Sequence, residues 1–122
     1  TYLRSFLYQK LITYILHFFF GAATIEANAF YNCITLTSIE IPASVTTIDP
    51  YALYKTDYLK NITFMGNIGT ISGYAFFYSG RNADTMSITF MGNVGTIETY
   101  AFRYSGYYAN FMSVNFRGTV NS

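Results

Sequence analysis

The feature that most constrains this chain is an internal repeat, because apolar residues return at matching positions every 23 to 26 residues. Each repeat begins with a Thr-Ile pair, at Thr24, Thr47, Thr70 and Thr96. Four residues after each Ile comes a small–large pair, which is Ala29-Phe30, Ala52-Leu53, Ala75-Phe76 or Ala101-Phe102. Self-similarity at this period is the sequence signature of a solenoid, in which each unit buries its apolar face against its neighbours.

An alternation of apolar and polar residues marks one strand in each unit. The segments are Ile39-x-Ile41, Ile62-x-Phe64, Ile88-x-Phe90 and Val114-x-Phe116. Alternation is typical of a strand with one buried face, so parallel strands are predicted at residues 38–41, 61–64, 87–90 and 113–116. Turn residues follow each strand, and the Thr-Ile beyond them is predicted to form a second extended piece on the opposite side. The small–large pair is expected to pack inward from an irregular helical turn.

The period divides the chain into units. Residues 24–121 hold four repeats, at 24–46, 47–69, 70–95 and 96–121, and together they form one domain. Residues 1–23 fit either a degenerate first repeat, which gives about five stacked units, or a remnant signal-like segment with Arg4 and Lys10 before an apolar run. That run is too short to span a membrane. The chain is expected to be a fragment of a longer protein.

Composition excludes several classes of function. The charged fraction is 11%, the net charge is +1 and the basic residues are scattered, so no stripe suits a nucleic-acid backbone. One Cys and one His leave no metal cluster and no catalytic triad, and neither an enzyme nor a cofactor is expected. Cys33 stands where later units have Thr56, Ser79 and Ser105. It is expected to be a buried, inert thiol.

The unit that begins at Thr24, the second if residues 1–23 are counted as a unit, carries a family resemblance. Its framework of Ala29-Phe30, Cys33, Leu36, Ile39, Ile41-Pro42, Val45 and Ile48 resembles the BspA-like, or Treponema-type, leucine-rich repeat. Later units depart from this pattern at the Cys and Ile-Pro positions and, in the last two, by three extra residues. The resemblance implies a curved leucine-rich-repeat solenoid with a parallel sheet on its concave side. It also implies a secreted or cell-surface protein that takes part in adhesion.

These observations predict a noncatalytic module that binds a protein or a glycan at a cell surface, or alternatively a structural spacer within a larger surface protein. Further repeats of a longer chain are expected as its neighbours. The contact residues are predicted on the two longer loops, at Arg81 and Asp84 on residues 80–84 and at Tyr107 and Tyr108 on residues 106–110. Exposed aromatic residues on loops are enriched at binding surfaces.

Three other features bear on the surface. The outward strand positions are predicted to form a flat, nearly neutral face, and they are Ser38, Glu40, Asn61, Thr63, Ser87, Thr89, Ser113 and Asn115. Tyr51, Tyr74 and Tyr100, which directly precede the small–large pairs, are interpreted as packing residues. Asn61-Ile62-Thr63 is an acceptor motif for glycosylation in a eukaryotic secretory pathway.

Overall fold

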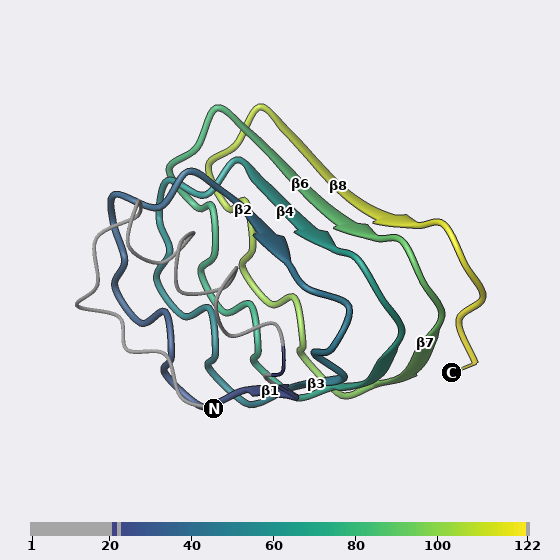
Figure 1. The fold of residues 1–122 in the computed structure, drawn as a ribbon. Helices are drawn as coiled ribbons and strands as arrows, with labels where there is room; N and C mark the ends of the chain where they lie inside the picture. The colour runs from purple at the N-terminus through teal and green to yellow at the C-terminus, as the bar shows by residue number, and fades with distance from the viewer. Residues whose placement is uncertain (1–20, 22, 122) are drawn as a thin grey trace.

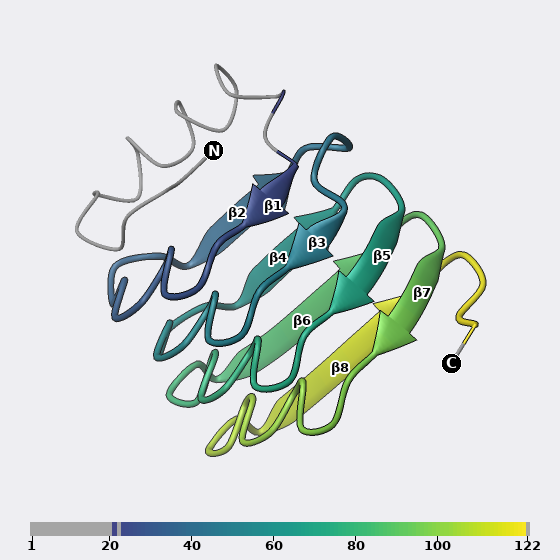
Figure 2. The same cartoon turned by 90° about the horizontal axis from the view of Figure 1, so that it is seen from below.

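The chain winds into a solenoid in a computed structural model that describes residues 21 and 23–121 (Figure 1). Two parallel four-stranded sheets run along it, in the orders β1-β3-β5-β7 and β2-β4-β6-β8. The strands of the first sheet are β1 (Thr24–Ile25), β3 (Thr47–Ile48), β5 (Ile68–Ile71) and β7 (Val94–Ile97). Those of the second are β2 (Ser38–Ile41), β4 (Asn61–Phe64), β6 (Thr85–Phe90) and β8 (Phe111–Phe116). Figure 2 shows the first sheet in front of the second, so the sheets form opposite sides of the solenoid.

The strand predictions are confirmed. Strands β2 and β4 have the predicted bounds, whereas β6 and β8 begin two residues earlier than predicted. Register follows the repeat, since Ile39 pairs with Ile62, Ile62 with Ile88 and Ile88 with Val114, all in parallel. The second extended piece predicted for each unit, at the Thr-Ile pair, is also confirmed, because these pieces form the β1-β3-β5-β7 sheet. The three extra residues of the longer units therefore lie outside the ladder and leave its register unchanged.

The predicted helical turn is wrong, because the chain forms successive tight turns there instead of a helix. Residues with positive φ occur in pairs four apart, such as Asn28 and Asn32 at 61° and 57°, and interrupt any helix. Amide groups in the turns alternate between two kinds of partner. The Ala29 N–H donates to Glu26 O within the unit at 3.0 Å, and the next N–H, of Phe30, donates to Ala52 O of the following unit at 2.9 Å. Each turn is thereby joined to its neighbour.

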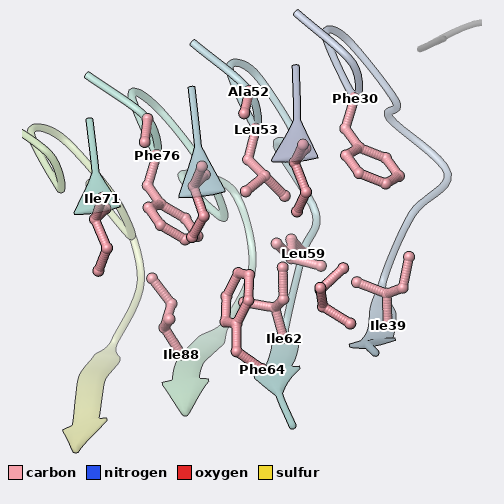
Figure 3. Close-up of a cluster of buried hydrophobic side chains, with 14 of the residues drawn as sticks. Phe30, Ile39, Ala52, Leu53, Leu59, Ile62, Phe64, Ile71, Phe76 and Ile88 are labelled. Carbon is pink, nitrogen blue, oxygen red and sulfur yellow. The ribbon is translucent and has the colours of Figure 1, made fainter. Parts of the chain in front are cut away.

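The core fills the space between the two sheets and the turns. Figure 3 shows Phe30, Leu53 and Phe76 directed into the interior together with strand residues such as Ile62 and Ile88. All of these side chains are fully buried, as are Ala52 and Ala75. The inward placement of the small–large pairs is thus confirmed for the units in which both members are buried. In the last unit Ala101 is buried and Phe102 is half-buried.

Small side chains at equivalent positions of the four units line up along the turns, and they are Cys33, Thr56, Ser79 and Ser105. The Thr56 and Ser79 hydroxyls both donate to the carbonyl oxygen of Leu53, at 2.9 and 2.6 Å, and the Ser105 hydroxyl donates to Phe76 O at 2.7 Å. The Cys33 thiol is buried, and this burial raises its pKa to about 11. The expectation of a buried thiol at this position is confirmed.

Candidate functional site

The two longer loops lie side by side. The N–H of Gly106 donates to Ser79 O at 2.8 Å, and that of Tyr108 donates to Arg81 O at 2.9 Å. A third bond of the same kind joins the Asn110 N–H to Asp84 O at 2.9 Å. Backbone register therefore brings the predicted contact residues together across two neighbouring units, at the end of the described chain that carries β8.

The predicted contact residues differ in how much of each side chain is free for a partner. Arg81 Nη2 forms an ion pair with Asp57 Oδ2 of the preceding unit at 3.1 Å, and its guanidinium carbon lies 4.9 Å from the Tyr78 ring centroid. Its charge is therefore largely compensated within the chain. Asp84 is exposed. Tyr107 and Tyr108 are 56% and 70% exposed, and their rings meet edge-on at 4.8 Å.

Tyr107 and Tyr108 are one end of a larger aromatic surface that continues over all four described units. We call it the aromatic wall, and it consists of Tyr31, Tyr51, Tyr54, Tyr74, Phe77, Tyr78, Tyr100, Tyr104, Tyr107 and Tyr108. Rings at equivalent positions stack from unit to unit, as in Tyr51–Tyr74 at 5.5 Å and Tyr78–Tyr104 at 5.2 Å between centroids. Other contacts join these columns, including Tyr104–Tyr107 at 5.3 Å. The wall is thus continuous.

Many wall tyrosines occupy a backbone conformation that bulky residues rarely adopt. Tyr51, Tyr74 and Tyr100 have φ of 60°, 61° and 63°, and Tyr78 and Tyr104 have φ of 56° and 57°. The left-handed region costs an ordinary L-residue roughly 1–2 kcal/mol. Asn28 and Asn32 occupy the equivalent positions in the first described unit, and Asn tolerates this conformation well. The turn geometry itself therefore does not require an aromatic side chain.

The interpretation of Tyr51, Tyr74 and Tyr100 as packing residues is correct only in part. They pack against other wall residues, yet they remain at the surface, and Tyr100 is 53% exposed. The sequence did contain a signal for the wall. A position held by Asn28 in one unit and by Tyr in the next three is more typical of an exposed left-handed turn than of a core.

The outward face of the β2-β4-β6-β8 sheet is a second periodic surface, and its polar side chains point away from the core as predicted. At the β8 end these side chains form hydrogen bonds with one another. Asn115 Nδ2 donates to Ser87 Oγ at 3.0 Å and to Ser113 Oγ at 3.2 Å, with a longer contact to Thr89 Oγ1 at 3.4 Å. Asn61, which carries the glycosylation motif, is exposed on this face.

Residues 21 and 23–121 contain no group of three or more His, Cys, Asp or Glu side chains that could hold a metal ion. In the same residues no helix has the length and apolar character that a membrane crossing requires. Most of residues 1–23, including the apolar run at 11–23 and the single histidine, His17, lies outside the described part of the chain. The structure therefore tests neither interpretation of residues 1–23.

Comparison with known proteins agrees with the geometry. A family model described as the BspA type leucine rich repeat region matches residues 3–121 in six copies. No curated protein and no solved structure matches the chain. The matched residues include all eight strands and the turns that carry the aromatic wall. This chain therefore belongs to the BspA-type leucine-rich repeat family.

Proposed function

We propose that this chain is a noncatalytic recognition module whose aromatic wall contacts a partner protein. The observation that carries the proposal is the continuous wall of aromatic rings in contact, six of whose tyrosines are exposed, that ends at Tyr107 and Tyr108. Large exposed apolar patches mark interaction sites, and Tyr is among the residues that dominate binding energy at protein interfaces. Five of these tyrosines also keep a left-handed backbone that favours Asn or Gly. Backbone strain of this kind supports a functional role for the side chains.

A protein fits the wall better than a glycan does. Sugar rings bind aromatic residues by placing C–H bonds against an open ring face. Along the stacked columns of the wall, ring faces are turned toward neighbouring rings, since Tyr51 and Tyr74 are 9° from parallel, or toward a guanidinium, since Arg103 lies 4.8 Å from the Tyr100 centroid. Ring edges and hydroxyls remain for the partner, and these suit the backbone and side chains of a polypeptide.

Two observations support the noncatalytic role. Repeats of this family are typically binding modules. In addition, the Cys33 thiol is buried and its raised pKa of about 11 keeps it protonated at neutral pH, so it lacks the thiolate that acts as a nucleophile. The common surface association of the family supports a cell-surface or extracellular location and a role in adhesion.

The structural spacer is the second candidate function. It is favoured by the outward face of the β2-β4-β6-β8 sheet, where Ser87, Ser113 and Asn115 satisfy one another with hydrogen bonds. A face of this kind offers little to a partner. The spacer and the recognition module differ in whether the aromatic wall mediates binding.

The test is a selection that assumes nothing about the partner. The full 122-residue chain would be immobilised and used to select binders from a displayed library of random protein fragments. Each binder would then be measured against a Tyr107→Ala, Tyr108→Ala variant and against a Ser87→Ala, Thr89→Ala variant of the sheet face. We expect most binders to lose affinity only for the first variant. Enrichment of no binder, or dependence on the sheet face alone, would refute the proposal.

A further inference from the structure

We propose that the aromatic wall binds an extended acidic polypeptide segment that runs along the solenoid axis, an inference that rests on the recognition function proposed above. After its rings have stacked, the wall still offers ring edges and hydroxyls to solvent, with three cationic side chains on it and acidic residues along its border.

The stacked rings present their electropositive parts outward. An aromatic ring has a negative face and a positive edge. In the stacked columns ring faces are used within the chain, because Tyr78 and Tyr104 stack 23° from parallel at 5.2 Å and Arg103 lies 4.9 Å from the Tyr104 centroid. Such columns leave positive ring edges at the surface, which attract carboxylate and carbonyl oxygens and disfavour cations.

The phenol hydroxyls add hydrogen-bond donors to these edges. Among the described residues, Tyr104 is the one wall tyrosine whose hydroxyl has an intramolecular hydrogen bond, which it accepts from Arg103 Nη2 at 3.2 Å. The other hydroxyls, including those of Tyr51, Tyr74 and Tyr100, are therefore available to donate to a bound acceptor. A carboxylate accepts several such bonds at once.

Cationic groups lie on the wall itself. Lys55 Nζ is 5.4 Å from the Tyr54 centroid, and the half-buried Arg103 has its guanidinium over the Tyr100 and Tyr104 rings. The hydrogen bond to the Tyr104 hydroxyl raises the pKa of Arg103, which like any arginine is charged at neutral pH. Arg81 contributes less because Asp57 neutralises it. Within the described part of the chain neither Lys55 nor Arg103 forms an ion pair, so both leave positive charge on the wall.

Acidic residues limit the width of the partner. Three acidic residues, Glu26, Asp49 and Glu98, each come two positions before the left-handed residue that begins a turn, which is Asn28, Tyr51 or Tyr100. They follow strands β1, β3 and β7 and so border the wall on the side of that sheet. A broad acidic surface would be repelled by this border, whereas a single extended segment fits inside it. Lys55 and Arg103 are two units apart, roughly 10 Å at the strand spacing, which about three extended residues span.

The experiment uses the full chain and peptides of defined charge. Labelled 15-residue peptides of the sequences (Glu-Ser-Gly)5, (Gln-Ser-Gly)5 and (Lys-Ser-Gly)5 would be titrated by fluorescence anisotropy, with an oligogalacturonate of five carboxylates as the glycan arm. We expect the acidic peptide to bind at least tenfold more tightly than the neutral and basic peptides and the oligosaccharide. Raising the salt from 0.1 to 0.5 M should weaken this binding, because screening reduces interactions between exposed charges.

A matched pair of charge-removing variants assigns the site. Arg103→Gln should weaken binding of the acidic peptide at least fivefold, whereas Lys60→Gln, which removes an exposed cation just before β4, should change it less than twofold. Equal losses for the two variants, or equal binding of acidic and neutral peptides, would overturn the inference. So would absence of binding at 1 mM peptide, and tighter binding of the oligogalacturonate would identify an anionic glycan instead. If selected binders depend on Tyr107 and Tyr108 but are not acidic, this inference fails while the recognition function stands.

Discussion

The aromatic wall and the outward face of the β2-β4-β6-β8 sheet are both periodic and both at the surface, yet they leave different groups for a partner. On the sheet face, Ser87, Ser113 and Asn115 use their hydrogen-bonding groups on one another. On the wall, ring faces are used in stacking, while ring edges and hydroxyls such as that of Tyr100 remain open. Regular spacing alone therefore does not identify a binding surface. What distinguishes the two surfaces is how many hydrogen-bonding groups and ring edges remain unused after the fold has formed.

The largest expected effect tests the core beneath the two surfaces. Ala75 is fully buried and Thr89 lies on the outward sheet face. An Asp at residue 75 would bury an unpaired carboxylate, which costs several kcal/mol, so Ala75→Asp should unfold the chain or lower its free energy of unfolding far more than Thr89→Asp does. Urea denaturation of the two variants measures the difference. Equal shifts would contradict the assignment of inward and outward faces.

A second prediction compares the two surfaces in binding. The Tyr107→Ala, Tyr108→Ala variant should keep its fold, because both rings are mostly exposed, and should lose about 2 kcal/mol of affinity for a selected binder, roughly thirtyfold. The Ser87→Ala, Thr89→Ala variant is the matched control. Titration calorimetry of each variant gives the comparison. A larger loss in the control would make the sheet the binding face.

The third prediction asks whether the wall stabilises the fold. Tyr74→Asn removes ring contacts with Tyr51, Phe77 and Tyr100, each worth about 0.5–1.5 kcal/mol, but relieves roughly 1 kcal/mol or more of left-handed backbone cost. The free energy of unfolding should therefore fall by about 2 kcal/mol or less, while affinity falls. Phe76→Ala, at a buried neighbour, should cost about 3–5 kcal/mol. Comparable destabilisation by both variants would make the wall a structural element.

A pH effect is expected at Cys33, which is buried in the fold under the wall. Its folded-state pKa of about 11 lies above the ordinary value of 9.0 because the thiol is buried. The folded chain therefore keeps a proton that the unfolded chain releases, so this contribution to stability is complete below pH 9 and is lost as the pH rises toward 11.

Two measurements check this prediction. The free energy of unfolding should fall more between pH 8 and pH 10.5 for the natural chain than for Cys33→Ala. Iodoacetamide at pH 8 should label Cys33 slowly in the natural chain and in both binding variants. Rapid labelling of the Tyr107→Ala, Tyr108→Ala variant would show that its loss of affinity comes from a disturbed fold.

The sequence was sufficient to predict the solenoid, its strands and their faces, because the alternation around residues such as Ile62 and Ile88 records burial directly. The turns were misjudged as helical because the small–large pairs show which side chains face inward and not the backbone dihedrals between them. Most of the wall was missed for a related reason. A tyrosine in a sequence pattern is usually assigned to the apolar residues, so Tyr51 and Tyr74 were expected to pack. Their surface position becomes evident only from the left-handed backbone and the stacking between units. The Arg81–Asp57 ion pair likewise depends on three-dimensional register between units.

The alternation of turn amides between their own unit and the next has a mechanical consequence. Bonds such as Phe30 N to Ala52 O run along the solenoid axis, as do those of both sheets. A force that pulls the two ends apart along this axis loads the bonds of one terminal unit at a time and does not shear a whole sheet at once. The chain should therefore peel unit by unit at low force. Each unit would release a contour length of about 75–85 Å, depending on its length, so a string of such repeats would extend in regular steps.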